Sequence, residues 1–369
     1  MPAFLDQALA LARQGLTLTS PNPAVGCVIA SPEGWVIGQG HTQIVGGPHA
    51  EVMALRAARE AGHDVRGGTA YVTLEPCSHF GRTPPCCNAL IEAGIAKVVV
   101  ARQDPNPLVA GQGVARLRAA GLEVSLLDPD DPAAIATREL NIGFFSRMIR
   151  KSPWVRMKMA ASLDGTTALA NGQSQWITGP EARADGHAWR ARASAVLTGI
   201  GTVLQDDPRL DVRLVETPRQ PCRIIVDSRL QTPPGAAMFK TGAPVWLYSA
   251  IRDEAREAAL TALGATVTCL PDGQGQVDLS AMLQDLGRRE INELHVEAGS
   301  RLNGALIGAG LVDEFLIYLA PKLLGPGRGM ASFGPLQSLS DALELQFQST
   351  EQVGPDLRIL ARVAGRGTF

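Results

Sequence analysis

Residues 46–51 read Gly-Gly-Pro-His-Ala-Glu, and residues 76–86 read Pro-Cys-Ser-His-Phe-Gly-Arg-Thr-Pro-Pro-Cys. These two segments supply one imidazole, His49, and two thiols, Cys77 and Cys86. Zinc prefers imidazole nitrogen and thiolate sulfur, and a catalytic zinc site uses three protein ligands and leaves a fourth position for water. The pattern therefore predicts a zinc site formed by His49, Cys77 and Cys86.

The expected local structure supports this ligand set. His49 precedes a helix-forming run at 50–61, and Cys86 begins a second helical run that ends near Gly94. Helix N-termini favour negative charge, which lowers thiol pKa values and strengthens metal binding. Glu51 is then placed to move protons to and from a water molecule. His-x-Glu followed by Pro-Cys and a second cysteine is typical of zinc-dependent base deaminases, so Glu51 is the predicted catalytic residue.

The spacing leaves a structural zinc site open as an alternative. Such a site uses all four positions, and Cys87 or His79 could supply the fourth ligand. Because Cys86 and Cys87 are adjacent, spacing alone does not decide between them. The remaining cysteines, Cys27, Cys222 and Cys269, are expected to be buried packing residues.

Around these segments the chain alternates strand-like and helical runs. In the first half, strands are predicted at 24–29, 70–74, 97–101 and 123–127, and helices at 50–61, 88–93 and 133–148. After Ser152-Pro153, strands are predicted at 154–160, 195–198, 223–226, 245–248, 265–270, 293–297 and 315–320, with helices at 181–192, 279–289 and 302–309. This alternation predicts α/β sheets with parallel pairing, in two domains that meet near residue 150.

Composition agrees with two domains and restricts the functional classes. The 369 residues are 45% hydrophobic and 19% charged, enough to bury two cores. Lys plus Arg total 34 and Asp plus Glu total 36, a formal net charge of −2, which argues against a nucleic-acid or membrane-surface partner. The N-terminus does not resemble a secretory signal, so we expect a cytoplasmic protein that takes a small-molecule substrate and forms a homo-oligomer.

The long loop between the two cysteines is more specific than His-x-Glu alone. Together with Asn-Pro-Ala-Val-Gly at 22–26 and residues 46–51, it closely resembles the deaminase domain of the bifunctional riboflavin-biosynthesis deaminase/reductase family, over residues 1 to about 146. The resemblance implies a cytidine-deaminase-like α/β/α fold, with Asn22 contacting the pyrimidine and His79, Arg82 and Thr83 holding substrate. Turn chemistry and a solvated charge would also account for these residues.

One position departs from the family pattern. Gly38-Gln-Gly40 is followed by His41 and then Thr42, whereas the family usually places an aromatic or small residue before its histidine. We assign no role to His41 or Thr42, and the metal ligands are unaffected.

The second half lacks a Gly-x-Gly-x-x-Gly fingerprint, so a classical Rossmann site is not supported. Instead, Leu-Thr-Gly-Ile-Gly-Thr at 197–202 and Val-Glu-Ala-Gly-Ser at 296–300 each follow a predicted strand, where backbone amides can approach a phosphate. Taken in order, these and other segments resemble the reductase domain of the same family, which has a dihydrofolate-reductase-like α/β fold. The further matching segments are 158–165, 174–178, 206–208, 226–228 and 321–325.

The resemblance implies two sets of binding residues. The NADPH set comprises Ala160, Trp176, Thr202, Asp206, Ser228, Gly299, Ser300, Arg301, Leu302, Asn303, Gly304 and Ala305. The substrate set comprises Lys158, Ser174, Arg190, Leu210, Arg213 and Glu297. Arginines can bind a sugar phosphate through two parallel hydrogen bonds, although Lys158 and Glu297 could equally form a structural salt bridge.

The sequence thus predicts two consecutive catalysts, a zinc-dependent deaminase at 1–147 and an NADPH-dependent reductase at 152–369. The expected substrate is 2,5-diamino-6-ribosylamino-4(3H)-pyrimidinone 5′-phosphate, and the expected product is 5-amino-6-ribitylamino-uracil 5′-phosphate. One alternative is a tRNA or nucleotide deaminase with an inert C-terminal domain. Another is a zinc-stabilised regulatory module that binds NADPH without chemistry, which the intact Glu51 argues against.

Overall fold

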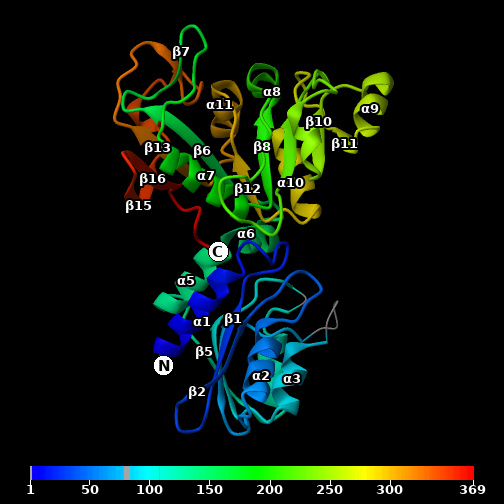
Figure 1. Cartoon of the computed structure of the whole chain (residues 1–369), viewed down its shortest axis with the longest axis vertical. Helices are drawn as coiled ribbons and strands as arrows, with labels where there is room; N and C mark the ends of the chain where they lie inside the picture. Colours follow the sequence, from blue (N-terminus) through cyan, green and yellow to red (C-terminus); the bar gives the residue numbers. More distant parts are fainter. Residues whose placement is uncertain (1, 79–83, 108) are drawn as a thin grey trace. The chain divides into compact units, whose positions relative to one another are not determined.

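The computed structural model describes residues 2–78, 84–107 and 109–369. The chain divides into two compact units, Met1–Arg150 and Lys151–Phe369, and each is described by itself (Figure 1).

The first unit is built on a five-stranded sheet in the order β2-β1-β3-β4-β5. Its strands are β1 (Gly26–Ala30), β2 (Val36–His41), β3 (Thr69–Leu74), β4 (Lys97–Arg102) and β5 (Glu123–Leu126). Its helices are α1 (Pro2–Gln14), α2 (Ala50–Glu60), α3 (Cys86–Glu92), α4 (Gln112–Ala119), α5 (Pro132–Leu140) and α6 (Ile142–Arg150). β1 is antiparallel to both β2 and β3, whereas β3, β4 and β5 are parallel.

Helices cover both faces of this sheet (Figure 1). On one face, Leu5 of α1 packs with Tyr71 and Val99 of the sheet in a core that extends to α5. On the other face, β2 lies against α2 so closely that a Cβ at Gly40 would stand 2.7 Å from the Ala54 nitrogen. The Gly-x-Gly at 38–40 is therefore explained by the close packing of β2 against α2.

The second unit is built on a nine-stranded sheet in the order β11-β10-β9-β8-β12-β6-β13-β16-β15. Its strands are β6 (Trp154–Ser162), β8 (Ala195–Gly199), β9 (Cys222–Val226), β10 (Val245–Ser249), β11 (Ala265–Cys269), β12 (Glu293–Val296), β13 (Glu314–Ala320), β15 (Leu345–Val353) and β16 (Asp356–Val363). The helices are α7 (Pro180–Arg192), α8 (Ile200–Asp206), α9 (Glu254–Thr261), α10 (Leu279–Arg288) and α11 (Ser300–Gly308), with 3-10 turns at Ala237–Thr241 and Leu339–Asp341. A separate ribbon pairs β7 (Thr166–Leu169) with β14 (Gly327–Gly329).

The seven strands from β11 to β13 in this order are parallel to one another, so their carboxyl ends meet at one edge, whereas β16 is antiparallel to β13. Helices α10 and α11 cover one face of this sheet, contributing Leu286 and Leu306 to its largest core. On the opposite face, Leu260 of α9 and Val203 of α8 pack on β8 to β10, and Ala182 of α7 packs on β13. Open α/β sheets bind ligands beyond the carboxyl ends of such strands.

The α/β prediction is confirmed in both halves, and the predicted strands are observed with ends shifted by a few residues at most. One predicted helix, 133–148, is wrong as a single element, because the chain forms α5 and α6 instead. The interruption lies at Asn141, whose side chain bonds both the backbone of Ala24 and the Thr137 carbonyl oxygen of α5. Among the described residues, no helix has the length and apolar character needed to cross a membrane.

Candidate active sites

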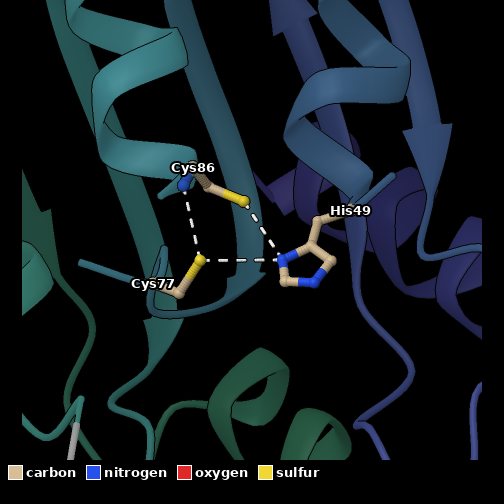
Figure 2. A group of neighbouring side chains, drawn as sticks. All are labelled: His49, Cys77 and Cys86. Atoms are coloured by element: carbon tan, nitrogen blue, oxygen red, sulfur yellow. Dashed lines mark hydrogen bonds between the residues drawn. The ribbon is translucent and has the colours of Figure 1, made fainter. Parts of the chain in front are cut away.

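Three predicted zinc ligands converge in the first unit (Figure 2). His49 is the residue preceding α2, Cys86 is the first residue of α3, and Cys77 lies just beyond β3. The Nδ1 atom of His49 lies 3.6 Å from the Cys77 sulfur and 3.2 Å from the Cys86 sulfur. All three ligand atoms lie within 4.8 Å of one another.

These separations fit a zinc ion. Zn–N and Zn–S bonds of about 2.0 and 2.3 Å at tetrahedral angles place nitrogen and sulfur about 3.6 Å apart. One nitrogen and two sulfurs form a donor set typical of zinc, and three ligands leave one position open. The residues present therefore fit a catalytic zinc ion.

A hydrogen bond couples the two ligand thiols. A hydrogen bond from the Cys86 thiol, together with its backbone N–H at 3.3 Å, lowers the pKa of Cys77 to about 4. The same contact and burial raise the pKa of Cys86. One thiolate is thus already formed, and metal binding must displace the proton of Cys86.

Glu51 stands beside the ligand set. Its side chain is almost fully buried in the first turn of α2. Burial raises the pKa of its carboxyl, and the negative charge of Cys77 raises it further. A general acid–base group works best when its pKa approaches the working pH, so this environment suits a residue that both accepts and returns a proton.

Cys87 faces away from the ligands. Its thiol lies 3.3 Å from the Pro76 carbonyl oxygen and 3.6 Å from that of Gly113, and donates to both. Burial raises the pKa of Cys87 to about 12. Its sulfur is therefore a buried hydrogen-bond donor and is not part of the ligand group. His79, the other residue considered as a fourth ligand, lies outside the described residues.

Sequence reasoning missed a carboxylate that supports this site. Glu75, two residues before Cys77, is buried and accepts three backbone N–H groups, from Asp104 at 3.3 Å, Gly111 at 2.9 Å and Val114 at 3.0 Å. It anchors the segment after β4 against the strand end that carries Cys77. The available signal was an acidic residue directly after an apolar strand.

Of the four residues predicted to contact the deaminase substrate, the structure describes only Asn22. Asn22 lies in the segment before β1, which is fixed because the Asn141 amide bonds the backbone nitrogen of Ala24 at 2.7 Å and its oxygen at 2.9 Å. The predicted substrate residues His79, Arg82 and Thr83 lie outside the described residues. His41 ends β2, and its Nδ1 atom lies 3.0 Å from the Thr42 carbonyl oxygen. This contact is local, and we assign no substrate role to His41 or Thr42.

The second unit carries a groove of about 930 Å³ along the carboxyl edge of its sheet. Ten residues of the predicted NADPH set line it: Ala160, Thr202, Asp206, Ser228, Gly299, Ser300, Arg301, Leu302, Asn303 and Ala305. No side chain caps the first turn of α11, which begins at Ser300. Its amide groups therefore face a groove of the size that a dinucleotide requires.

Two residues of the predicted NADPH set are not among the described groove residues. Trp176 is 60% exposed, and the Arg183 guanidinium lies 4.6 Å from the centre of its ring. Gly304 is on the buried side of α11, where a Cβ would stand 1.8 Å from the Ser332 carbonyl oxygen. Its role in this structure is close packing.

Lys158, Ser174 and Glu297, from the predicted substrate set, also line the groove. Arg190 bonds both carboxylate oxygens of Glu297, one of them at 2.8 Å from Nη2. Burial would raise the pKa of Glu297, but Arg190 and then Lys158 outweigh it and hold that pKa well below its usual range. Burial lowers the pKa of the Lys158 ammonium.

Arg190 connects this pair to the remaining substrate residues. Its Nη1 donates to the Asp211 carbonyl oxygen at 2.9 Å, and the Asp211 carboxylate pairs with Arg213 at 2.8 Å. Leu210 precedes Asp211, is buried, and has a φ of 52°. Arg213 is therefore connected to Glu297 through Asp211 and Arg190, and neither Leu210 nor Arg213 lines the described groove.

An open three-ligand zinc site in one α/β unit and a cofactor-sized groove in a second define a bifunctional enzyme, a zinc-dependent deaminase joined to a reductase. Family models match both parts, the cytidine and deoxycytidylate deaminase zinc-binding region at residues 2–102 and the RibD C-terminal domain at residues 153–359. The chain belongs to the riboflavin biosynthesis protein RibD family. Its cofactors are zinc and NADPH.

Relatives and solved structures match over nearly the full length. The riboflavin biosynthesis protein RibD of Escherichia coli (strain K12) is 45% identical and covers 96% of this chain and 97% of its own. That of Haemophilus influenzae is 44% identical, covering 96% and 95%. The structure of Acinetobacter baumannii RibD, form 1, is 40% identical, with a TM-score of 0.88 and 98% of each chain covered.

A Thermotoga maritima structure is described as a diaminohydroxyphosphoribosylaminopyrimidine deaminase/5-amino-6-(5-phosphoribosylamino)uracil reductase. It is 33% identical to this chain, with a TM-score of 0.85 and 98% of each chain covered. The full-length matches do not favour a deaminase with an inert C-terminal domain.

Proposed function

We propose that the chain catalyses two consecutive steps of riboflavin biosynthesis. Residues 1–147 would hydrolytically deaminate 2,5-diamino-6-ribosylamino-4(3H)-pyrimidinone 5′-phosphate. Residues 152–369 would then reduce the ribosyl group with NADPH, giving 5-amino-6-ribitylamino-uracil 5′-phosphate. The observation that carries the proposal is the convergence of His49, Cys77 and Cys86 beside the buried Glu51, on the same chain as the groove containing Lys158 and Glu297.

In the first step, zinc held by His49, Cys77 and Cys86 supplies Lewis acidity that makes a water molecule nucleophilic at neutral pH. Glu51 accepts a proton from that water as its oxygen adds to the ring carbon bearing the amine. Glu51 then returns the proton to the departing nitrogen, so that the carbon–nitrogen bond breaks and ammonia leaves. The raised pKa of Glu51 suits both transfers. Asn22, His79, Arg82 and Thr83 are the residues proposed to hold the pyrimidine phosphate.

In the second step, bound NADPH supplies the hydride that reduces the ribose at C1′. The chain positions the two reactants, with the cofactor along the groove and the sugar near Lys158 and Glu297. Arg190 holds the Glu297 carboxylate through two hydrogen bonds, which fixes its direction. The remaining groups proposed for substrate contact are Ser174, Leu210 and Arg213. Arg213 suits the phosphate because its side chain is 43% exposed and already oriented by Asp211.

The test is incubation with the pyrimidine phosphate, with and without NADPH, followed by mass measurement. We expect a gain of about one mass unit without NADPH, from amine to carbonyl, and about two more with it, from hydride and proton. Turnover of an RNA or a deoxycytidylate but not of the pyrimidine phosphate would contradict the proposal and favour the nucleotide deaminase.

Glu51→Gln separates the two steps within that experiment. The amide keeps the shape but cannot accept the proton, so we expect deamination to fall by about 10²–10⁴-fold while zinc content and reduction of the deaminated pyrimidine are retained. Glu60→Gln, at the exposed end of the same helix, is the control. Loss of both activities in Glu51→Gln would contradict independent sites.

We also propose a reducing, cytoplasmic location, because Cys77 and Cys86 must stay unoxidised to bind zinc. We further propose that the chain forms a homo-oligomer through β15. This strand ends the nine-stranded sheet, and Leu345 and Phe347 on it are 40% and 74% exposed. An exposed apolar edge strand favours pairing with another chain.

A further inference from the structure

The residues that line the groove in the second unit follow the order of the strands in the sheet. Along its carboxyl edge the neighbouring strands are β6, β12, β8 and β9. Lys158 and Ala160 come from β6, Gly299 follows β12, Thr202 follows β8, and Arg229 follows β9. All five residues line the one groove, and two strands, β12 and β8, separate the strand of Lys158 from the strand that Arg229 follows.

The turn that carries Arg229 is held rigidly. One carboxylate oxygen of Asp227 accepts both the backbone N–H and the hydroxyl of Thr232, each at 2.7 Å. Arg256 donates to the Arg229 carbonyl oxygen at 2.9 Å. Ser228 is fixed as well, since its hydroxyl donates to the Gln276 Oε1 atom at 3.2 Å and accepts the Val277 N–H at 3.3 Å. The backbone at Arg229 is therefore fixed in place beside the groove.

The charged side chains that line the groove differ in whether they have a polar partner among the described residues. Arg328 bonds the Gln205 side chain at 3.0 Å, and Lys158 lies near the Glu297 carboxylate. For the exposed guanidinium of Arg229, no hydrogen bond or ion pair occurs within the described part of the chain. It is a cation available to an anionic ligand in the groove.

The positions of the other cofactor groups follow from the groove. If reduction takes place at Lys158 and Glu297, the nicotinamide lies over β6 and β12. The pyrophosphate then meets the uncapped first turn of α11, at Gly299 to Arg301. A dinucleotide extended further along the groove brings its adenosine past β8 to the turn after β9.

We propose that Arg229 binds the 2′-phosphate of NADPH and sets the preference for NADPH over NADH. This inference rests on the proposed reductase function. A guanidinium can form two parallel hydrogen bonds to a phosphate and none of comparable strength to the 2′-hydroxyl of NADH. Arg301, at the helix terminus, contacts the pyrophosphate that both cofactors share.

The experiment measures dissociation constants of the full-length zinc-loaded chain by calorimetry, using NADP+, NAD+, adenosine 2′,5′-bisphosphate and AMP. Arg229→Gln is expected to raise the dissociation constants of NADP+ and the bisphosphate by about 10–100-fold. The dissociation constants of NAD+ and AMP are expected to change by less than about twofold. Arg301→Gln is expected to weaken NADP+ and NAD+ by the same factor. Arg252→Gln, an exposed arginine paired with Glu257, is the control for loss of surface charge.

The outcomes separate the inference from the function on which it rests. If Arg229→Gln weakens NADP+ and NAD+ equally, or leaves NADP+ unchanged, the assignment of Arg229 is overturned while the reductase proposal stands. If the unaltered chain binds neither NADP+ nor the bisphosphate, the proposed reductase function itself is overturned.

Discussion

Two adjacent cysteines have different environments at the beginning of α3. The sulfur of Cys86 is 3.2 Å from His49, whereas that of Cys87 donates to the carbonyl oxygens of Pro76 and Gly113. Consecutive residues on a helix point about 100° apart, so only one of the pair can face the metal. The other sulfur ties α3 to the segment that Glu75 anchors.

Serine substitutions distinguish these two roles. Cys86→Ser removes a thiolate ligand, so we expect zinc affinity to fall by at least about 100-fold, more than the loss of an outer-shell partner would cost. Cys87→Ser keeps a donor of similar size and should retain one zinc per chain. Chelator competition followed by metal analysis measures both, and equal zinc loss in the two variants would contradict the assignment.

The zinc ligands and Glu51 could be predicted because their chemistry restricts which residue types can serve. Glu75 and Asn141 could not, because each acts on backbone groups far away in sequence, at Val114 and Ala24. The choice between Cys86 and Cys87 also needed the direction of each side chain on the helix. Spacing locates a ligand to within a residue, and packing selects the residue.

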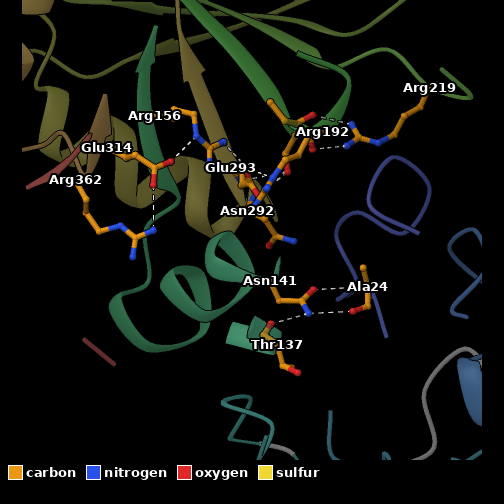
Figure 3. A network of polar contacts seen from close by, with 12 residues as sticks. Ala24, Thr137, Asn141, Arg156, Arg192, Arg219, Asn292, Glu293, Glu314 and Arg362 are labelled. Carbon is orange, nitrogen blue, oxygen red and sulfur yellow. Dashed lines mark hydrogen bonds and ion pairs between the residues drawn. The ribbon is translucent and has the colours of Figure 1, made fainter. Parts of the chain in front are cut away.

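At the scale of elements, the central strands of the second unit are tied together by buried charges (Figure 3). Arg156 of β6 bonds Glu314 of β13 and Glu293 of β12, each at 2.6 Å. Glu314 also pairs with Arg362 of β16 at 3.0 Å, and Glu293 with Arg192 of α7 at 2.9 Å. These side chains join four neighbouring strands and a helix near the amino ends of β6 and β12.

Removing one charge from this network should be costly and dependent on pH. Burial would raise the pKa of Glu314, but Arg156 and Arg362 outweigh it and lower that pKa. The stabilisation is therefore fully present above the ordinary glutamate pKa of 4.5 and is lost as pH falls through the lowered value. Glu314→Gln leaves Arg156 partly unpaired, so we expect about 3–5 kcal/mol less stability at neutral pH and a flatter decline in acid.

Urea unfolding at several pH values, followed by Trp fluorescence, measures this effect. One of the five tryptophans, Trp189, lies at the network, because the Arg156 guanidinium is 4.5 Å from the centre of its ring. Glu344→Gln, at an exposed glutamate of the same unit, is the control. A stability loss in Glu314→Gln that is independent of pH down to about 3 would show that the carboxylate charge is not the source.

The elements themselves were predictable to different degrees. Apolar runs such as β4 and β8 are recognisable because both faces of a parallel strand are buried. α1, α4, α8 and α9 were not predicted, and the split between α5 and α6 was missed because it lies at Asn141, whose contact with Ala24 is tertiary. The ionic network could not be predicted either, because the sequence does not show which charged residues of the strands pair with one another.

At the scale of the whole molecule, each unit has its own core, and the described residues of each candidate site come from a single unit. The second unit nevertheless leaves an incomplete edge. β15 is the last strand of its sheet, paired only with β16 among the described residues. Leu345 and Phe347 on this strand, and Leu343 just before it, are exposed. A second copy could add its own β15 antiparallel to this one about a two-fold axis.

Charge placed on this edge should therefore dissociate the proposed homo-oligomer without affecting zinc. Phe347→Glu puts a carboxylate where an exposed aromatic ring would be covered, and two copies of that charge would face each other across the axis. We expect the unaltered chain to elute at a multiple of its 38.9 kDa mass in light-scattering chromatography, and the variant to shift toward 38.9 kDa.

Trp35→Glu is the matched control, because Trp35 is 73% exposed and Phe347 is 74% exposed, yet Trp35 lies in the turn between β1 and β2 of the other unit. If the unaltered chain is already monomeric, the proposed homo-oligomer does not exist. If Trp35→Glu dissociates the oligomer and Phe347→Glu does not, the contact lies elsewhere than at β15. Retention of both activities in a monomeric Phe347→Glu variant would further show that each unit completes its site within one chain.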